Sequence, residues 1–186
     1  EFRRVLFRSY LFSQSSIFVI SDVYIPTNAI PPSPAFSLVN VQALIGTQYP
    51  MSVFPVDRDL YFANNYGLWA MRGVSVQRIS EDIDGTVQYF DQSWTITGGC
   101  SQVYNILNAA FLIKQLNDPI FGTRVLVAMY FDKKWWFYQV SDLAGLYPTF
   151  ICGGMANNRP TLFGFIGNKL YTFATNTAQS PAIEWK

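Results

Sequence analysis

The stretch FPVDRDLYFANNYGLWAMRG, residues 54–73, decides the fold class that the sequence predicts. Short apolar runs alternate in it with Asp, Asn and Gly, which favour tight turns and tolerate their backbone conformations. We predict turns at residues 57–59, 64–67 and 72–73, and strands at 60–63, 68–71 and 74–79, with Phe54 and Val56 leading in. The spacing indicates an antiparallel meander of about four strands in roughly 30 residues.

Both faces of these strands carry apolar side chains, because neighbouring strand residues point to opposite faces. Leu60 and Phe62 share one face, while Tyr61 and Ala63 share the other. The run VLVAMYF, residues 125–131, has the same property. A sheet with one wet face would alternate apolar and polar residues, so these sheets are expected to be stacked between others, as propeller blades are. We therefore predict an all-β fold of antiparallel meanders forming a partial β-propeller, with a β-sandwich as the alternative.

Other segments extend this pattern along the chain. Further strands are predicted at residues 15–25, 109–116, 122–131 and 135–140, with turns at 117–119 and 132–134. Segment 26–36 holds four prolines, so it is interpreted as a surface loop or a crossing between units. Gly98-Gly99 and Gly153-Gly154 are interpreted as turns. Residues 59–65 resemble 169–176, which follow the compact turn Gly167-Asn168, and repeats of about 40 to 50 residues would give roughly four blades or fewer.

Both ends of the chain bear on its extent. Residues 1–9, EFRRVLFRS, match a translated sequencing-library adapter, so we interpret them as an artefact. We interpret residues 10–186 as a fragment of one β-propeller-like domain, truncated at both ends, because the C-terminal AIEWK stops within a predicted strand. Without Glu1, Arg3, Arg4 and Arg8 the chain has 10 basic and 11 acidic residues, so its formal charge changes from +1 to −1. The charge therefore gives no indication of nucleic-acid binding.

The composition excludes several kinds of reaction site. The sequence has no histidine, which removes histidine bases, nucleophile pairs and metal ligands. Cys100 and Cys152 are too few for an all-cysteine zinc site. They are interpreted as small buried thiols, although pairing with each other stays open. Neither glycine pair begins a nucleotide-binding loop, no apolar run approaches the roughly 18 residues of a membrane span, and we expect neither a metal nor a cofactor.

Carboxylates offer candidates for sugar chemistry but no defined arrangement. Residues 80–86, SEDIDGT, are a near miss of the sialidase Asp-box. We interpret them as a solvated turn or helix cap rather than a cation site or a catalytic acid. A glycosidase needs two carboxylates about 5 to 10 Å apart, and the candidates are Asp57, Asp59, Glu81, Asp82, Asp84 and Asp91. A carbohydrate-binding or glycoside-cleaving propeller module is therefore the alternative function.

The segment Lys133-Lys134-Trp135-Trp136 combines cations with large aromatic side chains. Adjacent strand residues face opposite sides, so at least one of the two tryptophans is expected in the core. We take Trp136 as the candidate for partner contact, with Lys133 and Lys134 beside it at a charged hairpin tip. These three residues are the binding candidates that the sequence offers, and it offers no catalytic or metal-binding candidate that we retain.

The motifs also follow a recognisable order. They run through Ile45-Gly46-Thr47, Val53-Phe54-Pro55-Val56, Asp59-Leu60-Tyr61-Phe62-Ala63-Asn64, Tyr66-Gly67-Leu68-Trp69 and Arg78-Ile79-Ser80, then Ala110-Phe111-Leu112-Ile113, Asp118-Pro119, Gly122, Tyr130 to Trp136, Pro160-Thr161-Leu162-Phe163-Gly164 and Leu170-Tyr171. In this order and spacing, residues 15–175 resemble tailed-bacteriophage virion proteins, namely the propeller-bearing tail tubular, nozzle or tail-stabilisation proteins of short-tailed phages.

The resemblance implies a non-catalytic structural protein of a phage tail or head–tail junction, located in the virion. Its partners would be other virion proteins and further copies of itself in a homo-oligomeric ring, joined by heterologous contacts. The family carries no catalytic residues, so none is transferred to this chain. DNA would pass transiently without specific binding, and a near-neutral or slightly acidic wall would suit that passage because phosphate binding scales with exposed Lys and Arg.

Overall fold

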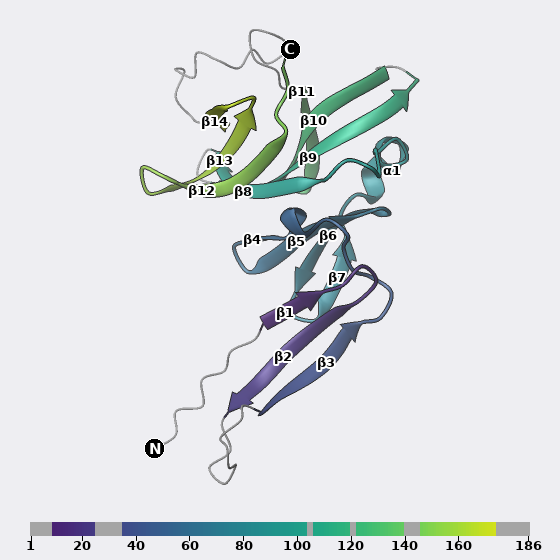
Figure 1. Cartoon of the computed structure of the whole chain (residues 1–186), viewed down its shortest axis with the longest axis vertical. Helices are drawn as coiled ribbons and strands as arrows, with labels where there is room; N and C mark the ends of the chain where they lie inside the picture. The colour runs from purple at the N-terminus through teal and green to yellow at the C-terminus, as the bar shows by residue number, and fades with distance from the viewer. Residues whose placement is uncertain (1–8, 25–34, 104–105, 120–121, 140–145, 174–186) are drawn as a thin grey trace. The chain divides into compact units, whose positions relative to one another are not determined.

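A computed structural model describes residues 9–24, 35–103, 106–119, 122–139 and 146–173 (Figure 1). The chain divides into two compact units, residues 1–48 and 49–186, and each is described by itself. Antiparallel strands make up most of the described residues, and the helices among them are short segments: Pro50–Ser52, Glu81–Ile83 and α1 (Asp84–Val87). The all-β prediction is confirmed. Within these ranges no helix is long and apolar enough to cross a membrane.

The first unit holds a three-stranded sheet in the order β1-β2-β3, formed by β1 (Ser9–Phe12), β2 (Ile17–Tyr24) and β3 (Ala35–Gln42). β2 confirms the strand predicted at 15–25, whereas β1 and β3 were not predicted. Ala35 and Phe36 lie in β3, so the loop interpretation of 26–36 is wrong for its last two residues. All four prolines of that segment precede Ala35, so none interrupts the strand. Residues 1–8 and 25–34 lie outside the described part.

The second unit begins with a four-stranded sheet in the order β4-β5-β6-β7. Its strands are β4 (Phe54–Val56), β5 (Asp59–Asn64), β6 (Gly67–Arg72) and β7 (Ser75–Arg78). Leu60 pairs with Met71 and Ala63 with Leu68, which confirms the predicted meander and its turns to within one or two residues. In the turn between β5 and β6, Gly67 is the residue with positive φ, at 142°.

A second four-stranded sheet has the order β11-β10-β9-β8. Its strands are β8 (Thr97–Val103), β9 (Ile106–Asp118), β10 (Gly122–Phe131) and β11 (Lys134–Gln139). The strands predicted at 109–116, 122–131 and 135–140 correspond to β9, β10 and β11, although Val140 lies outside the described residues. β8 was not predicted, because its two glycines were interpreted as a turn.

A three-stranded sheet in the order β12-β13-β14 completes the described part of the second unit. It consists of β12 (Phe150–Ala156), β13 (Arg159–Ile166) and β14 (Lys169–Phe173). Gly167-Asn168 form the predicted two-residue turn, since Ile166 pairs with Lys169. β14 therefore begins directly after a two-residue turn, as β5 does. Residues 174–176, the last ones of the proposed repeat, lie outside the described residues.

Gly98-Gly99 and Gly153-Gly154 lie within strands β8 and β12, so the turn interpretation of both pairs is wrong. A Cβ placed on Gly99 would lie 2.1 Å from the backbone nitrogen of Gly153, and one on Gly153 would lie 2.7 Å from that of Cys100. Glycine is needed here because two backbones approach closely, which is one of the established uses of glycine within a strand. The two strands are also joined by a hydrogen bond from the Ile151 N–H in β12 to Thr97 Oγ1 in β8, at 3.0 Å.

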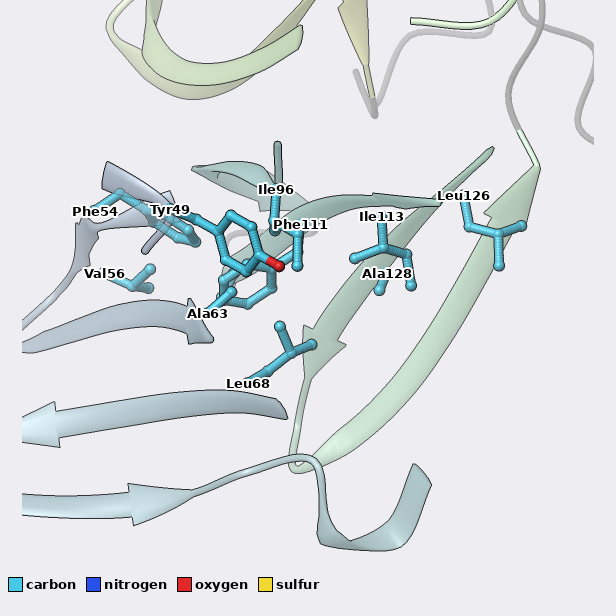
Figure 2. Close-up of a cluster of buried hydrophobic side chains, with 11 residues drawn as sticks. Tyr49, Phe54, Val56, Ala63, Leu68, Ile96, Phe111, Ile113, Leu126 and Ala128 are labelled. Carbon is cyan, nitrogen blue, oxygen red and sulfur yellow. The ribbon is translucent and has the colours of Figure 1, made fainter. Parts of the chain in front are cut away.

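The core consists of two clusters on opposite faces of the β8–β11 sheet. In β9 and β10 the buried side chains alternate between them: Ala109, Phe111, Ile113, Leu126 and Ala128 join one cluster, and Ala110, Leu112, Val125, Val127 and Met129 join the other. Figure 2 shows the first cluster, in which Phe54, Val56, Ala63 and Leu68 come from the β4–β7 sheet. The second cluster includes Ile151, Leu162 and Phe173 from the β12–β14 sheet. The prediction that the 125–131 strand is covered on both faces is confirmed.

Candidate functional site

The predicted hairpin tip joins β10 to β11. Phe131 pairs with Lys134, so Asp132 and Lys133 form a two-residue turn, and both have positive φ, at 49° and 59°. This is the turn geometry whose twist matches that of the flanking strands. Lys133 and Lys134 are both exposed, as expected for a charged tip.

The two tryptophans of β11 have different environments. Trp135 packs with Tyr130, at a ring-centroid distance of 4.9 Å, and its indole N–H donates to the Ile79 carbonyl at 2.8 Å. The expectation that at least one of the pair belongs to the core is confirmed for Trp135. Trp136 faces the other side of the strand and is 49% exposed.

The candidate binding residues gather at one end of an edge strand. β11 is the terminal strand of its sheet among the described residues, so one side of its backbone is not paired there. Lys134 and Trp136 are two positions apart and share a face, while Lys133 lies in the adjoining turn. A half-exposed indole beside two ammonium groups could take an apolar group flanked by carboxylates, and such aromatic anchors are enriched at protein interfaces. The partner contact itself stays a prediction.

The acidic segment 80–86 is helical rather than an irregular turn. Ser80 stands at the N-cap position of the short helix Glu81–Ile83, as the helix-cap interpretation has it, but its side chain makes no capping hydrogen bond. Ser80 is also fully buried, and its hydroxyl oxygen accepts the Leu68 backbone N–H at 3.1 Å, so the solvated interpretation fails for this residue. Glu81, Asp82 and Asp84 are exposed, as the solvated interpretation requires.

Three of the candidate carboxylates for sugar chemistry are engaged by basic side chains. Arg72 bonds Asp59 through Nη2 at 2.9 Å, and Arg78 bonds Asp84 through Nη1 at 3.3 Å. Lys114 Nζ lies 3.0 Å from Asp91. A general acid of a glycosidase must hold its proton near neutral pH, which a cationic neighbour disfavours. Asp91, whose pKa lies below its usual range, is therefore a poor candidate for that role.

Asp91 is the buried member of this group. Its Oδ1 accepts the Ser93 hydroxyl at 2.6 Å and the Ser93 backbone N–H at 3.0 Å. These hydrogen bonds, with Lys114 adding to them, hold the pKa of the Asp91 carboxyl below its usual range. Lys114 Nζ also lies 5.4 Å from the centre of the Trp94 ring, a cation–π distance. Sequence reasoning missed this cluster, although Asp-Gln-Ser is an order that permits the local Asp-to-Ser turn.

The two cysteines are free and half-buried. Cys100 packs against the first cluster, and burial raises the pKa of its thiol. Cys152 neighbours Ile151, whose side chain enters the second cluster, so alternation turns the Cys152 thiol to the opposite face of its sheet. Their backbones come close at the paired glycines, but the two thiols point away from each other. Among the described residues no group of three or more Cys, Asp or Glu is placed to hold a metal ion.

A scan against protein-family models found no match, and searches of the curated proteins and of the solved structures found no similar protein. The phage resemblance therefore rests on the order and spacing of the sequence motifs alone.

Proposed function

We propose that this chain is a non-catalytic structural component of a bacteriophage tail or head–tail junction, located in the virion and acting through protein–protein contacts. The observation that carries the proposal is the β8–β11 sheet, whose alternate side chains are buried against a different sheet on each face. Successive small sheets stacked in chain order suit a partial β-propeller better than a two-sheet sandwich, which has one buried face per sheet. That arrangement agrees with the family that the sequence resembles.

The hairpin tip gives this proposal a contact point. Trp136, Lys133 and Lys134 form an aromatic anchor with a cationic rim at the end of β11. Interface energies concentrate in such anchors, because a large rigid ring loses little conformational entropy when it is buried. We therefore place a contact to another virion protein at this tip.

The genes that flank the complete reading frame test the assignment as a phage structural protein. Portal, tail-fibre or capsid genes beside it are the expected finding, whereas neighbours devoted to polysaccharide uptake and degradation would overturn the proposal. Co-expression with the flanking virion genes then tests whether the hairpin tip contacts another virion protein. Trp136→Ala should reduce incorporation into assembled particles or subassemblies, while Tyr66→Ala, at another exposed aromatic residue, should leave incorporation unchanged.

One observation favours the alternative, a carbohydrate-binding module. Trp136 is a half-exposed aromatic ring on a strand, and sugars stack on such rings. Titrating the chain with oligosaccharides and monitoring its tryptophan fluorescence distinguishes the carbohydrate-binding function from the structural one. Saturable quenching that Trp136→Ala abolishes would support the alternative, and an unchanged spectrum supports assembly.

A further inference from the structure

Strand β11 carries a row of backbone groups that point away from its own sheet. The turn Asp132-Lys133 has two residues, so it is closed by hydrogen bonds between Phe131 and Lys134. Bonded and non-bonded pairs alternate along an antiparallel ladder, so every second residue from Lys134 on turns its N–H and C=O to β10. The residues between them turn these groups away from β10, and they are Trp135, Phe137 and Gln139.

This outward row has no partner among the described residues. β10 is the strand that pairs with β11, and no other described strand does so. Within the same ranges, no backbone hydrogen bond joins the three outward residues to a turn or a loop. An edge with unpaired N–H and C=O groups is a template for an added strand.

The other terminal strands of the second unit offer less to an added strand. β4 has three residues, and one of them is Pro55, which has no N–H to donate. β7 has four residues and β14 has five. β8 and β12 lie backbone against backbone at Gly99 and Gly153. β11 has six residues and neither proline nor glycine, so it is the described edge best suited to strand addition.

The side chains of β11 indicate what kind of strand would fit. Trp135 and Phe137 pack against the first cluster and are partly buried. An added strand would place apolar side chains beside them, because neighbouring strands pair their side chains face by face. On the other face, Lys134 and Trp136 are exposed. A carboxylate beside Lys134 and an apolar group beside Trp136 would complete that face.

Charge complementarity favours an acidic strand. Lys133 and Lys134 lie at one end of the edge, and among the described residues neither ammonium group is in an ion pair. Asp132 precedes them, so the tip has a net charge of +1. Burial, followed by the charge of Asp82, raises the pKa of Tyr130, whose ring joins the first cluster on the face opposite Lys134. That carboxylate therefore acts on the other side of the hairpin.

We propose that an extended, acidic segment of another virion protein adds to β11 as a further strand of the β8–β11 sheet. Its main chain bonds the outward N–H and C=O groups, and its carboxylates lie at the lysine end of the edge. A second copy of β11 is a poorer occupant, because β11 has no carboxylate to offer. The inference rests on the proposed assembly function and gives its contact a binding mode and a partner chemistry.

Hydrogen exchange of the free chain tests whether the edge is open. The N–H groups of Trp135, Phe137 and Gln139 should exchange at least about tenfold faster than those of the paired residues between them, because unpaired amides need no local opening. Equal protection of the two sets in the free chain would overturn the proposal, since another part of the same chain would then occupy the edge.

A peptide series tests the binding mode and the charge. The probe is a six-residue, end-blocked peptide in which valine alternates with two glutamates and a threonine, and its control has lysine in place of both glutamates. The contact is small, so the titration extends to about 2 mM. The acidic peptide should bind and slow exchange at the outward N–H groups. The lysine peptide should bind at least about threefold more weakly.

Methylation of the peptide nitrogens separates main-chain pairing from side-chain contact. Methylating one alternate set of nitrogens, or the other, gives two further forms of the acidic peptide. One form should lose binding and the other should keep it, because only one edge of the peptide faces β11. Any other pattern, or the absence of saturable binding by the acidic peptide, would overturn strand addition.

Variants of the chain locate the contact on β11. Gln139→Pro removes one outward N–H at an exposed position, and Gln139→Ala keeps it. The proline variant should bind the acidic peptide about 3- to 10-fold more weakly than the alanine variant, as expected for one lost hydrogen bond. Lys134→Glu should reverse the preference between the acidic and lysine peptides, whereas Lys169→Glu, on β14, should leave it unchanged. Equal peptide binding by the proline and alanine variants, both folded by circular dichroism, would contradict the proposal.

Self-pairing of β11 is tested by sedimentation equilibrium of the chain alone. A monomeric wild-type chain agrees with the proposal. Concentration-dependent dimers that Gln139→Pro abolishes would show that β11 pairs with a second copy instead, and would overturn the assignment of an acidic partner.

Co-expression with the flanking virion genes separates this inference from the proposed function. Loss of incorporation by both Trp136→Ala and Gln139→Pro supports strand addition. Loss by Trp136→Ala alone would show a side-chain contact at the tip, which overturns strand addition and leaves the proposed function standing. Flanking genes unrelated to virions would overturn the proposed function and leave the peptide results standing.

Discussion

Replacing Gly99 by Ala tests the close contact between β8 and β12. Seen from β8 alone, this change should stabilise the protein, because glycine within a strand costs about 0.5 to 1 kcal/mol relative to alanine. Seen from the packed structure, the new Cβ would lie 2.1 Å from the Gly153 nitrogen and 2.6 Å from the Cys152 carbonyl carbon. Both are backbone atoms that no side-chain rotation can move. The two views predict opposite signs.

The magnitude follows from the separation that relieves the clash. The strands must move apart by about 1 Å or more, and a gap of that size forfeits roughly a quarter to a half of each dispersion contact across it. Contacts of Ile151 and Leu162 with β9 and β10 lie in the same interface. Overpacking of this kind typically costs about 1 to 3 kcal/mol. We expect Gly99→Ala to lower the free energy of unfolding by about 2 to 3 kcal/mol, at the upper end because the clash is with backbone.

Urea and thermal unfolding followed by tryptophan fluorescence measure this effect. All five tryptophans lie in residues 49–186, so the signal reports on the second unit. The Tm should fall by roughly 5 to 15 °C. Gly85→Ala is the matched control, since no atom lies within 4 Å of its Cβ position, and it should be neutral or stabilising. A Gly99→Ala protein as stable as the wild type would refute the close packing of β8 on β12.

Three further predictions concern Asp91, Trp135 and the two cysteines. Asp91→Asn should lower the free energy of unfolding by about 1 to 3 kcal/mol at neutral pH. Because the folded pKa of Asp91 is depressed, the difference in stability from the wild type should shrink as the pH falls below about 4. A difference that is constant with pH would contradict the charge-stabilising hydrogen bonds from Ser93 and Lys114. Trp135→Phe should cost about 1 to 2 kcal/mol in urea unfolding, because the variant lacks the indole N–H that donates to a backbone carbonyl. Mild oxidation of the monomer should leave Cys100 and Cys152 unpaired. A mass loss of two hydrogen atoms within one chain, the sign of a disulfide, would contradict their opposite orientations.

The sequence patterns predicted strands and turns correctly where local turn chemistry and strand periodicity agree. The hairpin of β5 and β6 was predicted to within one residue at each end, because Asn64 to Gly67 favour a turn and the flanking runs are of equal length; in the structure Asn64 and Gly67 pair and the turn is Asn65-Tyr66. Burial of β10 on both faces was predicted from the lack of polar residues between Val125 and Met129. Strand alternation predicted that Trp135 and Trp136 face opposite sides, and the structure packs Trp135 against the first cluster while Trp136 is exposed.

The errors come from features that depend on tertiary contacts. Gly99 and Gly153 were taken for turns because a sequence cannot show that another backbone lies against them. Residues 80–86 were interpreted as a solvated turn or helix cap, whereas the buried Ser80 hydroxyl accepts the Leu68 N–H, twelve residues away, instead of capping the helix. The ion pair of Asp91 with Lys114 joins residues far apart in the chain, so no local pattern predicts it.

The most direct test of the stacked arrangement is a pair of alanine substitutions at neighbouring positions of β10. Leu126 enters the first cluster and Val127 the second, and each is 1% exposed. Leu126→Ala should lower the free energy of unfolding by about 2 to 4 kcal/mol, and Val127→Ala by about 1.5 to 3 kcal/mol. Substantial losses in both variants are the predicted result. A near-zero change in either one would mean that this face of the sheet is open to water, which would contradict the account.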